Sequence, residues 1–505
     1  MREIGDTADM VNMAMGQDQQ INIGAGQATV GKLACGQVIL GQGQHLAKRS
    51  QAIGGAGGRG ILRIGGRKAG VDQHGFARIG VNQEAADADD AAIRVDFKQA
   101  IIQNGQAGGR AGKNHERCPV LGPDGVTAGM KVKIHTLFQY LLETTTAEPE
   151  AIVGLSLARS PSLGDFLADL DPALKLDWNG VSFQGLPALR EAVIRQAGLM
   201  GVCGPHDVLI TAGAAEANYL AIRQLVAAGD EIVTESPGWP QVAVLAQAIG
   251  ASVRLVERRE QERWRLPLDR LAQAVTPRTR LIFLSNPNNP TGAMMDAADL
   301  AAVVAIADRV GAWLIVDEVY AGLEWTGPRA PSVAGMYPRG ITTGSVSKAL
   351  GLQGLRTGWL ICTDKAMILD AVILRENSSE IMNIMGETIA EIALRPSRLA
   401  QGLAQAKAEG TANLAVLDAF IAGQDRLSWV RPDAGLIGLA RLDGIEGEAF
   451  AQRLLAPPYK TFLLPGSAYG QPAHIRLGVG GGAEVALEKG LGRVAQLLAD
   501  WASPR

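Results

Sequence analysis

Between residues 205 and 365, short apolar runs alternate with segments whose apolar residues recur every three or four positions. A short apolar run bounded by turn residues is typical of a strand buried on both faces, and the longer spacing is typical of an amphipathic helix. Alternation of the two predicts a mostly parallel sheet sandwiched by helices, an α/β fold. The runs that predict strands number seven and lie at residues 208–210, 231–233, 252–256, 281–284, 313–316, 341–343 and 359–362.

The pattern changes after this region. Residues 364–423 are rich in alanine, leucine and glutamate at helical spacing, with a break at Pro396. Residues 427–501 mix short apolar runs with two amphipathic segments. We therefore expect a large α/β domain over residues 171–370 and a smaller α+β C-terminal domain over residues 371–505.

Residues 1–129 have a different composition from the rest of the chain. Glycine, alanine and glutamine recur there without a sustained period, and the only aromatic residues are Phe76 and Phe97. Such a segment buries little apolar surface to offset the entropy lost on ordering. We expect a disordered extension, or sequence upstream of a natural start at Met130. A glycine pattern at residues 55–60 has dinucleotide-binding spacing, but it lacks a predicted strand before it and a predicted helix after it.

Charge and cysteine content narrow the class of protein. The formal net charge is −3 and the densest charge run mixes both signs, so an extended nucleic-acid-binding face is not expected. The four cysteines lack the spacing of a zinc site or a disulfide framework, and we expect no metal. No apolar run approaches the roughly 18 residues that span a bilayer, and the first residues lack the apolar core of a signal peptide. We expect a cytoplasmic protein that binds neither nucleic acid nor membrane.

Residues 345–359, with the sequence SVSKALGLQGLRTGW, form the densest cluster of candidate chemistry. Lys348 lies in a glycine-rich turn between two predicted strands. Ser345 comes three positions before it, and Arg356 comes eight positions after it. A lysine surrounded in this way is more typical of a cofactor anchor than of a plain surface loop.

Further motifs follow predicted strands elsewhere in the chain. They are TAGAAE at residues 211–216, PGW at residues 237–239, NPNNPTG at residues 286–292, DEVY at residues 317–320 and IRLG at residues 475–478. As a set, with SxSKxxGxxGxRxG around the lysine, they resemble the class I/II aminotransferases of fold-type I, enzymes that use pyridoxal 5′-phosphate (PLP). The resemblance extends over about residues 150–500. It implies that residues 171–370 bind PLP and that residues 130–170 form an N-terminal arm joining the small domain.

The resemblance implies a role for each matched residue around the cofactor ring. Lys348 is expected to form the Schiff base with PLP and then to move the substrate proton between Cα and C4′. Asp317 is expected to pair with the pyridine nitrogen and keep it protonated, which makes the ring an electron sink. Tyr320 and Asn289 are expected at O3′, and Trp239 on the face of the ring.

The phosphate group needs positive charge and hydrogen-bond donors. Ser345 and Arg356 supply a hydroxyl and a guanidinium. The backbone amides of Gly213, Ala214 and Ala215 open the helix after the first strand, where free N–H groups and the helix dipole favour an anion. These five residues are therefore the expected phosphate site.

Arg476 matches the arginine that takes the substrate α-carboxylate with two parallel hydrogen bonds, a task that lysine performs poorly. Seven of the matched residues also have a plainer interpretation. The alternatives are a solvated turn for Lys348, a helix cap for Asp317, core aromatic residues for Tyr320 and Trp239, ordinary turns for Asn289 and Gly213, and a structural ion pair for Arg476.

Two positions depart from the family pattern. Members commonly carry a tyrosine that reaches the phosphate of the neighbouring subunit, and this chain has Gly180 at that place. Trp178 or Phe183 is a candidate to fill the space. Where members often have a glycine in the substrate loop, this chain has Arg159, which either binds an acidic side chain or faces solvent. This difference prevents any transfer of substrate preference.

The motifs predict a PLP-dependent aminotransferase that moves an amino group from an amino acid to a 2-oxo acid by a ping-pong mechanism. The resemblance implies a homodimer, since neighbouring subunits complete each other's sites in the family. A PLP-dependent lyase or decarboxylase on the same fold is the alternative, because these reactions share an intermediate. A transcription regulator with an aminotransferase-like domain is a third hypothesis, but residues 1–129 lack the helical periodicity of a winged helix-turn-helix. The donor and acceptor depend on pocket side chains that the sequence does not place.

Overall fold

The computed structural model describes residues 132–144, 148–177, 182–325, 327–481 and 484–501, together with strands between residues 20 and 95. The chain divides into two compact units, Met1–Pro123 and Asp124–Arg505. The strands of the first unit are β1 (Gln20–Ile23), β2 (Gly26–Leu33), β3 (Gln37–Gly41), β4 (Ala52–Gly55), β5 (Arg59–Leu62), β6 (Arg67–Val71), β7 (Ala77–Val81) and β8 (Ile93–Val95).

In the first unit, β1, β2 and β3 form one antiparallel sheet, β4, β5 and β8 form a second, and β6 pairs with β7. The glycine pattern at residues 55–60 joins two antiparallel strands, because Gly55 of β4 pairs with Arg59 of β5. That arrangement differs from the strand-turn-helix of a dinucleotide site. The sequence pattern does not predict these strands, and the interpretation of residues 1–129 as an extension stays a prediction.

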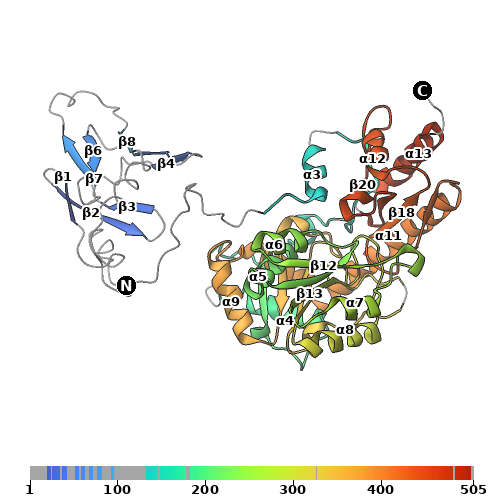
Figure 1. Cartoon of the computed structure of the whole chain (residues 1–505), viewed down its shortest axis with the longest axis horizontal. Coiled ribbons are helices and arrows are strands. Elements are labelled where there is room, and N and C mark those ends of the chain that lie inside the picture. Colours follow the sequence, from blue (N-terminus) through green and yellow to red (C-terminus); the bar gives the residue numbers. More distant parts are fainter. Residues whose placement is uncertain are drawn as a thin grey trace. The chain divides into compact units, whose positions relative to one another are not determined.

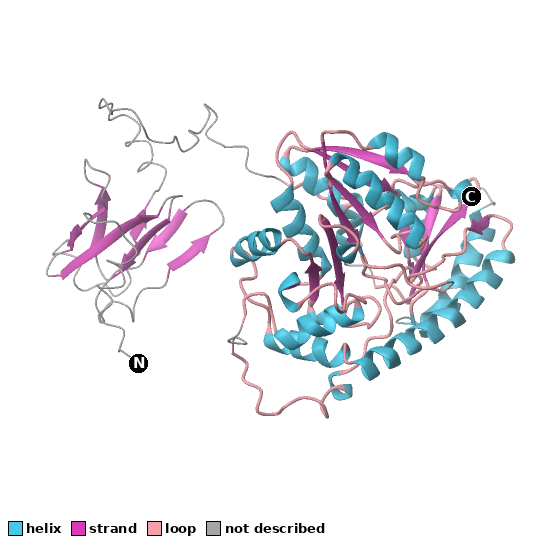
Figure 2. Ribbon diagram, turned by 90° about the horizontal axis from the view of Figure 1, so that it is seen from below, coloured by secondary structure: helices cyan, strands magenta, loops and turns pink. Residues whose placement is uncertain are grey.

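The second unit is built on a seven-stranded sheet. Its strand order is β10-β16-β15-β14-β13-β11-β12, with β16 antiparallel to both neighbours and the other adjacent pairs parallel. Every predicted run coincides with one of these strands, so the mostly parallel sheet is confirmed (Figure 2). The strands are β10 (Val208–Thr211), β11 (Glu231–Ser236), β12 (Ser252–Glu257), β13 (Thr279–Ser285), β14 (Trp313–Asp317), β15 (Gly340–Ser345) and β16 (Gly358–Ile361).

Helices cover both faces of this sheet (Figure 2). In β13, Leu281 and Phe283 pack with α5, α6 and α9, whereas Ile282 and Leu284 pack with α7 and α8. Helices α4 and α10 join the second face farther along the sheet. Burial on both faces explains why the strands read as continuous apolar runs. The helices are α4 (Pro187–Gln196), α5 (Ala214–Leu225), α6 (Gln241–Ile249), α7 (Leu268–Ala274), α8 (Ala297–Val310), α9 (Lys365–Glu376) and α10 (Ile384–Ala393).

Local sequence fixes several helix starts. Pro187 occupies the first turn of α4, where its missing N–H costs no hydrogen bond. The Asp296 carboxylate accepts hydrogen bonds from the N–H groups of Ala298 and Asp299, at 2.8 and 2.9 Å, and so caps α8. The residues at these two positions therefore determine where α4 and α8 begin.

The smaller α+β domain is also confirmed. Its antiparallel sheet has the order β17-β18-β21-β20, and three helices accompany it (Figure 1). The helical pattern broken at Pro396 corresponds to α9 and α10 before the break and α11 after it. None of the described helices has both the length and the apolar character needed to cross a bilayer. The elements are α11 (Pro396–Ala422), β17 (Leu427–Trp429), β18 (Ile437–Leu442), α12 (Gly447–Leu455), β20 (Leu464–Pro465), β21 (His474–Gly478) and α13 (Glu484–Trp501).

The segment before the large sheet packs on the small domain. Strand β9 (Ala151–Ile152) pairs in parallel with β19 (Thr461–Phe462). In α3 (Thr136–Glu143), the Tyr140 hydroxyl donates a hydrogen bond to the Leu463 carbonyl at 3.2 Å. The predicted boundary at residue 370 falls inside α9, which packs on the large sheet. The division into 130–170, 171–370 and 371–505 stays a prediction.

Candidate active site

A cavity of about 360 Å³ lies between the carboxyl ends of the parallel strands and the small domain. The last residues of β13, β14 and β15 all line it, which is where open α/β sheets bind ligands. Most residues predicted from the sequence meet here. They are Ala214, Ala215, Trp239, Asn289, Asp317, Tyr320, Ser345, Lys348, Arg356 and Arg476.

Lys348 lies in the turn after β15, with its amine directed into this cavity. Desolvation by the surrounding protein and the charge of Arg476 lower the pKa of Lys348 to about 8, against the raising effect of Asp317. Its Nζ donates a hydrogen bond to the Ser156 hydroxyl at 3.4 Å. A lysine with this pKa is partly neutral near pH 7, so it can act as a nucleophile and as a base.

The turn that carries Lys348 is held by the loop after β9. The N–H of Ala158 donates to the Lys348 carbonyl at 3.0 Å. Gly351 has a φ of +67°, and a Cβ there would lie 2.3 Å from the Arg159 carbonyl oxygen. Only glycine allows this close approach, which explains its place in the motif.

Asp317 ends β14, and its carboxylate is buried. Burial raises the pKa of Asp317 to about 6, while a hydrogen bond from Asn218 opposes this shift. Asn218 Nδ2 donates to Asp317 Oδ2 at 2.8 Å. The Thr343 hydroxyl in turn donates to Asn218 Oδ1 at 2.7 Å and fixes the amide. The carboxylate is therefore fixed for pairing with a protonated ring nitrogen. The sequence reading missed Asn218, although it lies four residues after Ala214 on the same helix.

The phosphate residues gather at the start of α5. Gly213 does not itself line the cavity, but with a φ of +87° it approaches Arg356, and a Cβ there would lie 2.4 Å from Nη2. Arg356 donates to the carbonyls of Ala212 at 3.1 Å and Gln353 at 3.2 Å. The guanidinium is thus held beside the free N–H groups of the helix N-terminus, near Ser345.

Tyr320 and Asn289 supply neutral polar groups to the cavity. Asn289 Oδ1 is buried without a hydrogen-bond partner among the described residues. The Tyr320 hydroxyl has no described partner at bonding distance either, although Ser156 lies near enough to affect its titration. Burial raises the pKa of Tyr320 to about 12, against the lowering effect of Arg476. Orphaned polar atoms of this kind indicate a missing polar ligand.

Arg476 enters the cavity from the middle of β21. Its Nη1 donates to the Tyr469 hydroxyl at 2.7 Å, and its Nη2 donates to the Gly154 carbonyl at 2.8 Å. Nε is buried without a partner, and the described residues provide no carboxylate at ion-pair distance. The surroundings therefore suit an arginine that receives a carboxylate from a ligand.

Trp239 follows β11 and is half-buried against the small-domain core. Its Nε1 donates to Gln241 Oε1 at 3.1 Å, and Gln241 Nε2 donates to the Ala215 carbonyl at 2.9 Å. The indole is thereby tied to the start of α5. Gln241 was also missed in the sequence reading, because its role depends on this tertiary contact.

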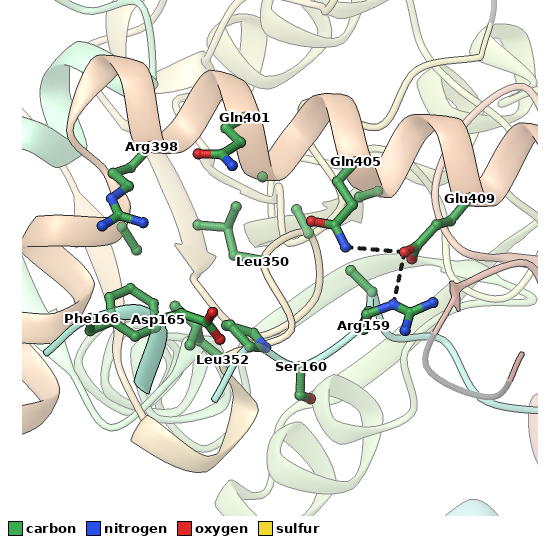
Figure 3. Close-up of a pocket in the computed structure, with 16 residues that line it drawn as sticks. Arg159, Ser160, Asp165, Phe166, Leu350, Leu352, Arg398, Gln401, Gln405 and Glu409 are labelled. Carbon is green, nitrogen blue, oxygen red and sulfur yellow. Dashed lines mark hydrogen bonds and ion pairs between the residues drawn. The ribbon is translucent and has the colours of Figure 1, made fainter. Parts of the chain in front are cut away.

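The two departures from the family pattern have different outcomes. Gly180 and Trp178 lie outside the described residues. Phe183 is exposed and is not among the residues that line the cavity. Arg159 is also absent from that lining, because its Nε donates to Glu409 at 2.9 Å beside a second cavity of about 320 Å³ (Figure 3).

These observations fit PLP. The Gly213–Arg356 contact leaves a donor-lined cradle at the helix N-terminus, and Asn289 Oδ1 offers an unused polar atom. Asp317 and Lys348 lie in the same cavity, as the two ends of a pyridoxal ring require.

Comparison with known proteins agrees with this geometry. A family model described as Aminotransferase class I and II matches residues 179–494. The arginine–pyruvate transaminase of Pseudomonas aeruginosa is 30% identical over 332 residues, covering 63% of this chain and 82% of that protein. The capreomycidine synthase of Streptomyces vinaceus is 28% identical over 346 residues, covering 67% of this chain and 87% of that protein. A PLP-dependent aminotransferase structure from Streptococcus suis has a TM-score of 0.68 and 26% identity, covering 74% of this chain and 100% of that one.

Proposed function

The chain belongs to the class I and II aminotransferases, and we propose that Lys348 is the residue that binds its PLP and transfers the substrate proton. The enzyme uses PLP to move an amino group from an amino acid to a 2-oxo acid, in two half-reactions of a ping-pong mechanism. One observation supports this role for Lys348 above all. Its partly neutral amine shares a cavity with the buried Asp317 carboxylate and the Arg476 guanidinium.

The remaining residues hold the reactants in place. Bound PLP supplies a carbonyl carbon that takes up the amino group and a ring that withdraws electrons from the substrate Cα. The Asp317 carboxylate, fixed by Asn218, holds the proton of the ring nitrogen. Arg356, with Ser345 and the N–H groups at the start of α5, binds the phosphate.

The substrate is positioned from the opposite side. Arg476 receives the α-carboxylate, and its contacts with Tyr469 and Gly154 hold the guanidinium plane in one orientation. With PLP bound, Lys348 Nζ would take the proton from Cα and deliver it to C4′ of the cofactor. Tyr320, Asn289 and Trp239 line the same cavity, where the first two would hold the ring oxygen and Trp239 the ring face. Together these contacts orient the Cα–H bond toward the lysine.

We propose two further properties of the protein. The first is a homodimer, which the family resemblance supports and light scattering tests; an active monomer would contradict it. The second is a cytoplasmic location, with which the free, buried thiols of Cys203 and Cys362 agree.

The activity is tested by adding a panel of amino acids to the purified holoenzyme and following the absorption of bound PLP. Conversion to the pyridoxamine form, reversed by a 2-oxo acid, is the expected result. The alternative is a PLP-dependent lyase or decarboxylase. One relative is named as a synthase and not as an aminotransferase, which supports testing this alternative. Product formation without a recoverable pyridoxamine form would support the alternative.

A further inference from the structure

The charged side chains that line the main cavity are Asp317, Lys348, Arg356 and Arg476. Each has a role toward PLP or the substrate α-carboxylate. The side toward α3, β19 and β20 instead carries apolar side chains, which we call the apolar wall. It consists of Leu137, Leu141, Leu155, Leu157, Phe462 and Leu464.

The apolar wall adjoins the group that receives the α-carboxylate. Leu464 of β20 lies directly opposite Arg476 of β21. Side chains of directly opposed residues in an antiparallel pair project on the same face of the sheet, so Leu464 flanks the guanidinium. Leu155 follows Gly154, whose carbonyl accepts a hydrogen bond from Arg476 at 2.8 Å. A substrate held by Arg476 therefore has apolar surface beside its Cα.

Helix α3 completes this wall. Leu137 and Leu141 are four residues apart, so they lie on one face of the helix, and both line the cavity. The helix is anchored by the hydrogen bond from the Tyr140 hydroxyl to the Leu463 carbonyl. Its start lies near the cofactor side, because the His135 ring centroid is 6.2 Å from that of Trp239. The wall is thus part of the folded small domain.

Arg159, two residues after Leu157 of this wall, points away from the main cavity. Arg159 makes an ion pair with Glu409 of α11, and Gln405 donates to the same carboxylate at 3.2 Å (Figure 3). Arg159 lines the second cavity and not the main one. The described part of the wall therefore has no cation for an acidic substrate side chain and no carboxylate for a basic one.

We propose that the preferred amino donors are amino acids with an apolar side chain, aliphatic or aromatic. This inference rests on the proposed function. With the α-carboxylate on Arg476 and the amine toward Lys348, the third substituent of Cα meets the apolar wall. A carboxylate or guanidinium placed there loses its water without gaining a partner from the described residues of this chain, which is unfavourable, whereas each added methylene gains by burial.

The first test compares donors in the first half-reaction of the holoenzyme. Leucine, methionine and phenylalanine are expected to convert PLP to the pyridoxamine form at least about a hundredfold more efficiently than aspartate, glutamate or arginine. Equal or greater efficiency for a charged donor would overturn the inference while leaving the aminotransferase assignment intact. Failure of every amino acid would overturn the proposed function, and this inference with it.

The second test measures binding instead of turnover, with matched variants on α3. Both leucines are partly open to solvent, at 38% and 54% exposure for Leu141 and Leu142, but only Leu141 lines the cavity. Leu141→Arg should weaken binding of the unreactive 4-methylpentanoate by about tenfold and strengthen binding of glutarate, as measured by calorimetry on the holoenzyme. Leu142→Arg is the control and should change neither dissociation constant. Equal effects of the two variants, or no effect of Leu141→Arg, would overturn the inference.

Discussion

The sheet side of the cavity and the apolar wall differ in chemistry and in the elements that form them. On the sheet side, ionisable groups lie at strand ends, where parallel strands fix their separation. The apolar wall comes from α3, β19, β20 and the loop after β9, which pack on the small domain and not on the large sheet. Under the proposed function, the contrast teaches that the reaction depends on charges fixed by the sheet, whereas donor choice depends on an apolar surface formed by other elements.

The largest effect is expected on the sheet side, from Lys348→Ala. This variant lacks the amine that we propose attaches PLP and moves the Cα proton, so kcat/KM should fall by at least about 10⁴-fold. PLP should still bind, because the phosphate contacts remain. Lys407→Ala on α11, outside the main cavity, is the control and should retain activity. Near-normal turnover of the Lys348 variant would remove it from the reaction.

Asp317→Asn tests whether the buried charge, and not only the shape of the site, matters. An amide cannot hold the proton of the ring nitrogen by ion pairing, so kcat should fall by about 10² to 10³-fold. Substrate binding should change little, since Arg476 is untouched. A fall in kcat/KM that came entirely from KM would contradict the role given to Asp317.

Arg476→Lys acts at the junction between the two sides. An ammonium cannot reproduce the paired hydrogen bonds to a carboxylate, so KM should rise and kcat/KM should fall by about a hundredfold. PLP absorption should be unchanged. If kinetics matched those of the parent enzyme, the structural interpretation of Arg476 would stand.

Asn218→Ala tests how the Asn218 hydrogen bond sets the pKa of Asp317, through the pH dependence of protein stability. The pKa of Asp317 is raised from 3.8 to about 6, so the cofactor-free folded state binds its proton more tightly than the unfolded state does. The contribution of Asp317 to the free energy of unfolding is therefore greatest below about pH 4. This contribution falls by about 3 kcal/mol as the pH rises through 6. The Asn218 hydrogen bond lowers this pKa, so its loss should extend the decline to higher pH.

Urea unfolding of the cofactor-free protein across this pH range measures the effect. Asp317→Asn is the control, because it has no carboxyl group to titrate and should lack this component of the decline. An Asn218→Ala profile identical to that of the parent protein would show that the hydrogen bond does not set the pKa.

The smallest effect is expected from the segment that precedes all the motifs in the sequence. Removal of residues 1–129 should leave folding and PLP binding unchanged, because the motifs and the small domain all come after residue 129 in the sequence. Thermal unfolding and PLP content of the two forms provide the measurement. Aggregation or cofactor loss confined to the shortened protein would make the first unit part of the fold.

The sequence predicted the residues on the sheet side of the cavity but not those of the apolar wall. Asp317 and Lys348 follow buried strands within compact motifs, so local pattern was enough to find them. Asn218, Gln241 and Ser156 act through contacts with residues distant in the chain, as the 99-residue separation of Asn218 from Asp317 illustrates. Their roles depend on how the elements pack.

The same limit applies to strand order and to the wall itself. The apolar runs predicted that seven strands exist, but not that β16 runs antiparallel between β10 and β15. Leu137 and Leu464 lie more than 300 residues apart in the sequence. The Tyr140–Leu463 hydrogen bond, which anchors the same helix, spans 323 residues. No local pattern marks such pairs, because only the folded small domain brings them together.

The central claim, that Lys348 is the residue that binds PLP, is tested most directly by reducing the wild-type holoenzyme with borohydride and mapping the labelled peptide by mass spectrometry. Borohydride fixes PLP to the lysine that carries it. The account predicts one pyridoxyl group per chain, on the peptide that contains Lys348. A label on any other lysine, or a stable holoenzyme in which no lysine is labelled, would contradict it.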